Sequence, residues 1–323
     1  MDILKYQSDF LSYLDSKKII KEPKNLYEPI DYILQIGGKR IRPMLTLIAS
    51  DIFSGDYEKA MPAALAVEVF HNFTLVHDDI MDDAPLRRGN ETVHEKWDIN
   101  TGILSGDAML ILAYQYFENY EPIVFQKLAK LFSKTALEVC DGQQLDVDFE
   151  TRNDVTIHEY IKMITLKTSV LVAAALKMGA IVANASDEQA QHLYNYGLNL
   201  GIAFQLQDDY LDTYGNPETF GKQVGGDIIE NKKTYLYLKA FEVANDADKE
   251  KLTVLYNKKQ KNISEKIKTV SAIFSKNNIP KHTKQLIEYY TNKSFDSLVH
   301  LNISDAQKNG LRLFGENLMS RKV

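Results

Sequence analysis

Cysteine is almost absent from this sequence of 323 residues. The single cysteine, Cys140, excludes an intramolecular disulfide and a cysteine-rich zinc site, and it fits a reducing compartment. We interpret Cys140 as a packing residue. No run approaches the about 20 apolar residues that a membrane span needs, and residues 1–15 lack the apolar core of a signal peptide. The sequence therefore predicts a cytoplasmic protein without a membrane span.

Positive charge is also in deficit, since the formal net charge is -6. A nucleic-acid binder needs a basic excess to displace counterions, so nucleic acid is not the expected partner. The composition is 45% hydrophobic and 25% charged, which is typical of a folded protein. Any anionic ligand must be met by local clusters of positive charge.

Only eight prolines interrupt the chain, which leaves long intervals for helices. Apolar residues recur at steps of three and four, as in Ile202, Leu206 and Tyr210, and strand-like alternation is scarce. We therefore expect an all-α fold, a large helical bundle with a turn at Ser275 to Pro280 before a final pair of helices. No serine- or glycine-rich linker divides the chain, so residues 1–323 are expected to form a single domain.

Two aspartate clusters share one spacing. The first contains Asp78, Asp79 and Asp82, and the second contains Asp208, Asp209 and Asp212. In a helix, residues four apart lie about 40 degrees apart around the axis, so the first and last aspartate of each cluster share a face. Carboxylate oxygens of this kind suit Mg²⁺, which completes its coordination with water and phosphate oxygens. The clusters predict Mg²⁺ sites for a diphosphate.

A solvated acidic face is the plain alternative for either cluster alone. Both clusters, however, follow apolar segments, Phe73 to Val76 and Ile202 to Phe204. Carboxylates on a buried helix are costly unless a metal or another cation compensates them. The repeated pattern therefore favours metal binding.

Positive charge gathers at two places near the first cluster. Arg87 and Arg88 lie between Pro85 and Gly89, directly after the aspartates. Earlier in the chain, Gly37 to Pro43 places Lys39, Arg40 and Arg42 at a predicted helix start, which favours anion binding. Both segments are candidate phosphate sites.

Further polar residues accompany the second cluster. Lys167 and Thr168 interrupt an apolar run, and Gln205 lies about one turn before Asp208. Packing explains one such residue, whereas a hydroxyl and an amide oxygen together would stabilise a developing carbocation. A glycine-bearing loop with Lys222 and Lys232 follows, and it is expected to close over a substrate.

Taken in order, these motifs resemble the trans-isoprenyl diphosphate synthases. The shared features are Gly-Gly-Lys-Arg-x-Arg-Pro, Asp-Asp-x-x-Asp with Arg-Arg-Gly, Gly142-Gln143-Gln144-x-Asp146, Lys167-Thr168 and Phe204-Gln205-x-x-Asp-Asp-x-x-Asp. The resemblance covers about Gly37 to Thr234. It implies an isoprenoid synthase bundle with a central substrate cavity, usually a homodimer, that joins isopentenyl diphosphate head-to-tail to an allylic diphosphate.

The resemblance also implies a role for each motif residue. Asp78 and Asp82 would hold two Mg²⁺ ions and Asp208 a third, with Asp79, Asp209 and Asp212 in support. Isopentenyl diphosphate would be bound by Lys39, Arg42, His71 and Arg88. The allylic diphosphate would be held by Arg87, Lys167, Lys222 and Lys232, and the carbocation would be stabilised by Thr168 and Gln205.

The histidines near the first cluster need separate interpretations. His71 lies two helical turns before Asp78 on the same face, which agrees with a role in binding isopentenyl diphosphate. A histidine on an apolar helix is otherwise a packing residue. His77 and His94 are interpreted as structural residues.

Bulky residues one or two turns before the first cluster limit product length in the resembling enzymes. Here Phe70, Phe73 and Thr74 occupy those turns. Two phenyl rings predict a short product, farnesyl or geranylgeranyl diphosphate, rather than a long polyprenyl chain. The two-residue gap between Asp79 and Asp82 differs from that of typical bacterial farnesyl diphosphate synthases, so the longer of the two products stays open.

Three other functions are weighed against this one. A longer-chain polyprenyl diphosphate synthase is the first alternative, and Phe70 and Phe73 argue against it. A terpene cyclase shares metal-triggered ionisation but has no use for the cationic residues Lys39, Arg42 and Arg88. A non-catalytic synthase subunit typically lacks aspartates from one cluster, and both clusters are complete here.

Overall fold

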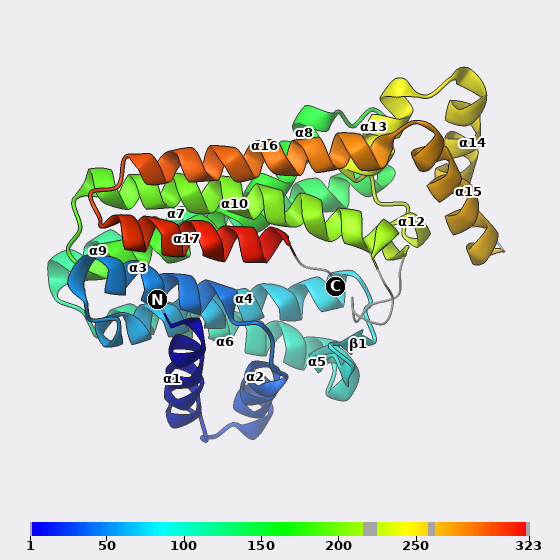
Figure 1. Cartoon of the computed structure of the whole chain (residues 1–323). Coiled ribbons are helices and arrows are strands. Elements are labelled where there is room, and N and C mark those ends of the chain that lie inside the picture. Colours follow the sequence, from blue (N-terminus) through cyan, green and yellow to red (C-terminus); the bar gives the residue numbers. More distant parts are fainter. Residues whose placement is uncertain (1, 216–224, 258–261, 321–323) are drawn as a thin grey trace. The chain divides into compact units, whose positions relative to one another are not determined.

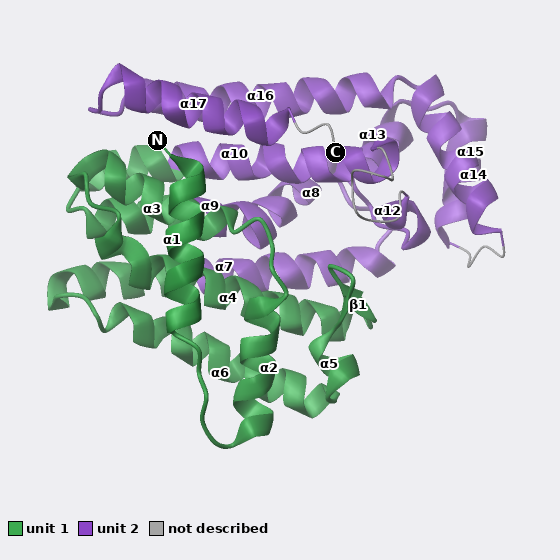
Figure 2. Cartoon of the chain, turned by 60° about the horizontal axis from the view of Figure 1, so that its bottom comes forward, with its two compact units in different colours: residues 1–134, 174–194 green, residues 135–173, 195–323 purple. Residues whose placement is uncertain are grey.

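The computed structural model describes residues 2–215, 225–257 and 262–320 (Figure 1). The chain divides into two compact units, shown in Figure 2. Unit 1 comprises residues 1–134 and 174–194, and unit 2 comprises residues 135–173 and 195–323. Each unit therefore takes segments from distant parts of the sequence. The single-domain organisation of residues 1–323 stays a prediction.

Unit 1 is built from helices and one small hairpin. Its elements are α1 (Ile3–Ser16), α2 (Lys24–Gln35), α3 (Ile41–Ser54), η1 (Glu58–Ala60), α4 (Met61–Met81), β1 (Leu86–Arg87), β2 (Asn90–Glu91), α5 (Val93–Lys96) and α6 (Ile99–Phe117). Helix α4 packs mainly against α6, with α3 also in contact. Proline in the first turn of α4 suits a helix start, where its missing N–H costs nothing. This helix carries the first aspartate cluster at its C-terminal end.

Three helices continue from one unit into the other. They are α7 (Pro122–Thr151), α9 (Val170–Val182) and α10 (Asp187–Tyr214). The remaining elements lie in unit 2 and are α8 (Ile157–Ile164), the π-helical turn η2 (Thr165–Ser169), α12 (Gly226–Ile229), α13 (Tyr235–Val243), α14 (Asp246–Asn257), α15 (Ile263–Lys276), α16 (Ile279–Val299) and α17 (Asp305–Met319). Thr156 and Glu159 form a capping box that starts α8.

The all-α prediction is confirmed, because the β1–β2 hairpin is the only sheet among the described residues. The predicted turn near Ser275 also lies where we expected it. Helix α15 ends at Lys276, Asn278 adopts a left-handed conformation with φ 57°, and α16 begins at Ile279. Pro280 belongs to the first turn of α16, where proline is tolerated.

Two expectations from composition need correction. Cys140 is exposed on α7 and is therefore not a packing residue, because its position on that helix points to the surface. We expected no segment with the character of a membrane span, but residues 157–182 are helical, long and apolar enough to cross one. In the structure, 72% of the most apolar 18 residues of this segment are buried, which is typical of a helix in the core of a protein.

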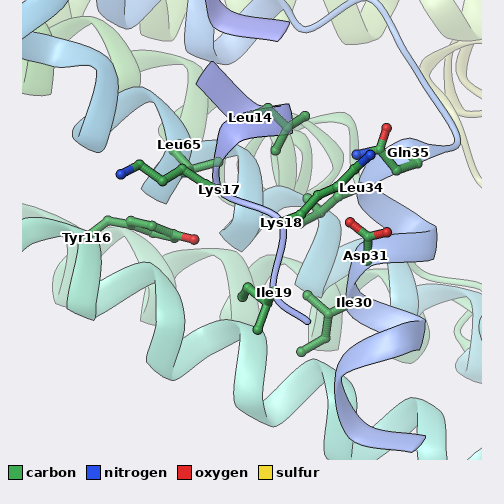
Figure 3. A pocket seen from close by; sticks show the side chains of 10 residues that line it. All are labelled: Leu14, Lys17, Lys18, Ile19, Ile30, Asp31, Leu34, Gln35, Leu65 and Tyr116. Carbon is green, nitrogen blue, oxygen red and sulfur yellow. The ribbon is translucent and has the colours of Figure 1, made fainter. Parts of the chain in front are cut away.

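Unit 1 also contains a small enclosed cavity of about 10 Å³, drawn in Figure 3. Its lining combines apolar side chains such as Leu14, Ile30 and Leu65 with the polar Asp31 and Gln35. The volume is about that of one water molecule. None of the predicted site residues lines it, so this cavity is not the substrate site.

Candidate active site

The first aspartate cluster ends α4 in unit 1. Asp79 is 1% exposed and is held by Arg87, whose Nε lies 2.9 and 2.8 Å from the two carboxylate oxygens and whose terminal nitrogen lies 2.6 Å from Oδ1. Asp78 is partly exposed, and Asp82 is exposed at the C-cap of the helix. The middle aspartate is therefore buried and paired with an arginine, whereas the outer two reach the surface.

A two-residue hairpin turn follows Arg87, which binds Asp79 of α4. Leu86 pairs with Glu91 and Arg87 with Asn90, which leaves Arg88 and Gly89 as the two residues of the turn. Both have positive φ, 54° and 78°, as a two-residue hairpin turn of this hand requires. The Arg-Arg-Gly sequence thus has a structural reason as well as a chemical one.

The predicted isopentenyl diphosphate residues gather in unit 1. The terminal nitrogen of Arg42 lies 3.1 Å from Nε2 of His71, and a terminal nitrogen of Arg88 donates to the carbonyl oxygen of Gly37. At Gly38, φ is 127°, and a Cβ atom would lie 2.5 Å from the Arg88 guanidinium. The positive φ is the reason that glycine suits this position, because other residues rarely adopt it. Lys39 is exposed on the same loop.

Arg40 does not belong to this anion site. It is 4% exposed, forms an ion pair with Glu68, which is 2% exposed, and donates to the carbonyl oxygen of Leu34. The sequence placed three cations at the start of α3, but one of them neutralises a buried carboxylate. Arg40 therefore stabilises unit 1, and Lys39 and Arg42 remain as candidate phosphate ligands.

Burial and neighbouring positive charge keep His71 neutral. Removal from water lowers its pKa well below the ordinary value of 6.5, and the neighbouring Arg42 and Arg88 lower the pKa further because they repel a second positive charge. A neutral imidazole can accept a hydrogen bond from Arg42. His77 has a different role, because its Nε2 lies 3.3 Å from the carbonyl oxygen of Ile103 and its ring packs against Gly106. The structural interpretation of His77 agrees with these contacts.

The predicted chain-length residues lie beside a group of aromatic rings in unit 1. Phe70 is 1% exposed, and its ring centroid lies 5.0 Å from that of Phe132 and 5.5 Å from that of Phe73. Phe73 is partly exposed and also contacts His77 at 4.8 Å. Thr74 is partly exposed and donates to the carbonyl oxygen of His71. Phe70 is thus a core residue, and Phe73 lies nearer the surface of the unit.

The second aspartate cluster lies on α10 in unit 2 and repeats the pattern of the first. Asp209 is 6% exposed, accepts a hydrogen bond from the Tyr160 hydroxyl, and lies 2.9 Å from Nε2 of Gln205. Asp208 and Asp212 are partly exposed. Asp212 accepts a hydrogen bond of 3.0 Å from the backbone N–H of Asp227. Again the middle aspartate is buried and the outer two are partly exposed.

Lys167 and Thr168 lie in the π-helical turn η2. Such turns are rare and often occur at functional sites. Nζ of Lys167 lies 2.5 Å from a carboxylate oxygen of Asp146, and Oγ1 of Thr168 lies 3.1 Å from Oε1 of Gln205. At Gly142 a Cβ atom would lie 2.2 Å from the backbone nitrogen of Lys167. The Gly142 to Asp146 motif therefore lets α7 approach the turn and pairs with its lysine.

Buried carboxylates concentrate negative charge in unit 2. Burial raises the pKa of Asp209 to about 6, although the hydrogen bonds from Tyr160 and Gln205 oppose this shift. Burial, together with Asp209 and Asp212, also raises the pKa of Asp227 well above its ordinary value. Cations near these groups would favour their ionised forms. The oxygen-only donor set and this excess of negative charge fit Mg²⁺.

Two lysines complete the predicted set. Nζ of Lys232 forms an ion pair of 2.9 Å with Glu230. Burial alone would lower its pKa, but Glu230, Asp227 and Asp146 raise the pKa above its ordinary value, so Lys232 is positively charged. Lys222 lies outside the described residues. The glycine-bearing segment that the sequence predicted as a closing loop is described from Gly225, where α12 follows.

Sequence reasoning missed Tyr160 and Glu68. Both are buried and bind a residue of a recognised motif. Tyr160 is 49 residues from Asp209, and Glu68 is 28 residues from Arg40. No spacing rule connects residues so far apart, although the polar Glu68 within the apolar run Ala63 to Phe70 was a detectable signal.

A family model for polyprenyl synthetase matches residues 23–273. A geranylgeranyl diphosphate synthase of Methanosarcina mazei is 44% identical over 231 residues, which are 71% of this chain and 71% of that protein. A geranylfarnesyl diphosphate synthase of Natronomonas pharaonis is 40% identical over 247 residues, covering 71% and 72%. Among solved structures, a geranylgeranyl pyrophosphate synthase superposes with a TM-score of 0.95 at 53% identity, over 100% of both chains.

Proposed function

Because the chain belongs to the polyprenyl synthetase family and is a chain-elongating prenyltransferase, we propose that it condenses isopentenyl diphosphate with an allylic diphosphate to give a C15–C20 product. In this reaction the allylic diphosphate ionises, the double bond of isopentenyl diphosphate attacks the cation, and a proton is lost. The product is a trans-prenyl diphosphate, and each condensation lengthens its carbon chain by five carbons.

The cationic group in unit 1 carries this proposal. His71 contacts Arg42, Arg88 is tied to the loop at Gly37, and Lys39 is exposed on that loop. These basic residues are not part of the aspartate cluster, and their positive charge suits a second anionic substrate. A terpene cyclase uses one diphosphate, so the cationic group favours a two-substrate enzyme. Isopentenyl diphosphate is the anion that we assign to it.

The two aspartate clusters supply ligands for Mg²⁺. We place two ions on Asp78 and Asp82 and a third on Asp208 with support from Asp212. Asp79 and Asp209 then orient Arg87 and Gln205, in agreement with their hydrogen bonds. When bound, Mg²⁺ neutralises the charge that develops on the departing diphosphate.

Side chains of unit 2 prepare the reacting carbon. Gln205 donates its amide N–H to Asp209, which orients Oε1 toward Thr168. The oxygen atoms of Gln205 and Thr168 then offer negative dipoles to an allylic cation. Arg87, Lys167, Lys222 and Lys232 hold the allylic diphosphate in this proposal. Lys167 is positioned for this by Asp146.

The short product follows from the rings before the first cluster. Phe73 lies nearer the surface of unit 1, with Phe70 behind it and Thr74 beside it. Two similar proteins, a geranylgeranyl and a geranylfarnesyl diphosphate synthase, support a product near the upper end of the proposed range. We therefore favour geranylgeranyl diphosphate over farnesyl diphosphate.

We also propose that the protein is a homodimer. Helix α6 exposes several large apolar side chains, Ile99, Ile103, Leu104 and Ile111, with exposed fractions of 41% to 59%. A run of this kind on one helix is a candidate interface, because isolated exposed apolar residues are normal but a group of them is not. A second copy of the chain would cover it.

The proposed function is tested with purified protein, Mg²⁺, isopentenyl diphosphate and primers of five, ten or fifteen carbons. Diphosphate release and chromatography of the dephosphorylated products are the two measurements. We expect turnover with at least one primer and a dominant product of C15 or C20. Absence of turnover with every primer, or turnover of the primer without isopentenyl diphosphate, would contradict it.

A matched pair of variants links the activity to the first cluster. Asp78→Ala should lower turnover at least about 100-fold, because it removes a ligand of the ions that assist ionisation. Asp296→Ala removes an exposed aspartate from α16 and should leave turnover unchanged. Equal activity of the two variants would remove Asp78 from the site.

A further inference from the structure

A third group of potential metal ligands lies beside the arginine hairpin in unit 1. It consists of Asp83, His94 and Glu95, and one ligand atom of each lies within 4.8 Å of the others. Asp83 precedes the hairpin, whereas His94 and Glu95 lie in α5 directly after it. The group contains no member of the two aspartate clusters. It also differs from them chemically, because it includes an imidazole.

The state of His94 points to a missing partner. Its side chain is only 5% exposed, and neither ring nitrogen has a hydrogen-bond partner among the described residues. A buried polar group without a partner costs about 1–3 kcal/mol. Nε2 faces Oε1 of Glu95 at 3.7 Å, beyond hydrogen-bond distance. The imidazole is therefore directed at a carboxylate that it does not directly bind.

We propose that Asp83, His94 and Glu95 bind a divalent transition-metal ion of the Zn²⁺ class. A neutral imidazole nitrogen and two carboxylates form a donor set that Zn²⁺ accepts, and water would complete a four-coordinate site. Mg²⁺ prefers oxygen donors, so it belongs to the aspartate clusters instead. The ion would supply the partner that Nε2 of His94 lacks.

The distances allow this coordination with small movements. Ligand atoms about 2.1 Å from a tetrahedral ion lie roughly 3.4 Å apart. The separation of 3.7 Å between His94 and Glu95 is already close to that value. Asp83 and Glu95 are exposed, so their side chains have room to rotate toward the buried imidazole. The buried histidine is therefore the fixed ligand, and the two exposed carboxylates would rotate to reach the ion.

An ion at this place would hold the two ends of the hairpin together. Thr92 already joins them, through a hydroxyl bond of 2.8 Å to the Ala84 carbonyl and a backbone bond of 3.2 Å to that of Pro85. The hairpin carries Arg87, which binds Asp79, and Arg88, which binds Gly37. A bound ion would therefore stabilise the segment that presents both arginines. Its expected effect on isopentenyl diphosphate affinity rests on the proposed function, whereas binding of the ion does not.

The test uses Co²⁺ as a coloured substitute for Zn²⁺. Chelator-treated full-length protein in excess Mg²⁺, which occupies the oxygen-only clusters, is titrated with Co²⁺ while visible absorption is recorded. We expect an absorption band that saturates at one Co²⁺ per chain and disappears when Zn²⁺ is added. Absence of the band at this ratio would overturn the proposal.

The double variant Asp83→Asn with Glu95→Gln removes two ligands from exposed positions and preserves side-chain size. It should weaken Co²⁺ binding about 100-fold or more, since loss of even an outer hydrogen-bond partner costs roughly 10–100-fold. Glu91→Gln, which changes an exposed carboxylate on the same hairpin, should bind Co²⁺ like the unaltered chain. Equal binding by the double variant would mean an ion held elsewhere and would overturn the assignment.

Thermal unfolding supplies a second measurement that is independent of catalysis. Zn²⁺ should raise the midpoint for the unaltered chain and for Glu91→Gln, but not for the double variant, because a ligand stabilises only the folded form that binds it. A shift that persists in the double variant would contradict the site. A chain that binds Co²⁺ in this way but does not turn over isopentenyl diphosphate would refute the proposed function and leave the metal site standing.

Discussion

Tyr160 donates a hydrogen bond to Asp209, and Asp209 in turn accepts one from Gln205. Tyr160 is a fully buried residue of α8, and Asp209 is the middle residue of the second cluster. The bond links α8 to the side chain that orients Oε1 of Gln205 toward Thr168. Under the proposed function, we expect Tyr160 to act as a positioning residue, which orients Gln205 through Asp209.

Tyr160→Phe should lower kcat about tenfold with little change in KM, because the loss of a hydrogen bond to a charged group costs about 1.5–3 kcal/mol. Tyr196→Phe is the matched control, since Tyr196 is also fully buried in unit 2 but donates to the backbone oxygen of Leu311. Steady-state kinetics and thermal unfolding of both variants give the comparison. If the two lose stability and kcat alike, Tyr160 has only a structural role.

The aspartates of the first cluster should separate into two kinds. Asp79→Asn leaves Arg87 without its charged partner in a partly buried pair and should lower the free energy of unfolding by about 1.5–3 kcal/mol. Asp82→Asn changes an exposed side chain and should alter that free energy by less than about 0.5 kcal/mol. Its turnover should nevertheless fall sharply. Urea unfolding together with diphosphate release measures both quantities, and equal stability of the two variants would contradict the division.

Product length should respond to Phe73 more cleanly than to Phe70. Phe73 is partly exposed, so Phe73→Leu and Phe73→Ala should lengthen the product in that order at modest cost in stability. Phe70→Ala empties a packed position beside Phe132 and should cost about 3–5 kcal/mol. Chromatography of the products and thermal unfolding are the measurements. If Phe73→Ala leaves the product unchanged, Thr74 or Phe70 limits the product length instead of Phe73.

His71 should remain neutral through the physiological range. Its pKa lies well below 6.5 in the folded protein, so the unfolded chain binds more protons as the pH falls through 6.5. The contribution of His71 to folding stability is therefore present above pH 6.5 and is lost as the pH falls below it. Nuclear magnetic resonance of the imidazole, assigned with His71→Gln, should show no titration between about pH 6 and 8. A midpoint near 6.5 would contradict the effect of the arginines.

The proposed homodimer should depend on α6. Leu104 and Ile111 are each 59% exposed, and Leu104→Glu should convert the dimer to monomers because a charge would be buried at the interface. Ile20→Glu is the control, since Ile20 is 91% exposed and lies outside that helix. Sedimentation velocity distinguishes the two states. A dimer that survives Leu104→Glu would place the interface on another surface.

The sequence by itself determined the helical character of the chain and the chemistry of its motifs. Apolar periodicity and the spacing of Asp78 with Asp82, or of Asp208 with Asp212, are local properties that a helix turns directly into shared faces. These features needed no knowledge of which helices pack together.

The tertiary structure decided which members of each motif meet a partner inside the protein. Arg40 and Arg42 are alike in sequence, yet Arg40 is buried against Glu68 while Arg42 lies beside His71. Asp209 is buried, and one of its two hydrogen bonds comes from Tyr160, which is 49 residues away. Burial and long-range contacts depend on how helices associate, and that association follows from the whole core rather than from any one segment. The buried, unpartnered imidazole of His94 is visible for the same reason only after folding.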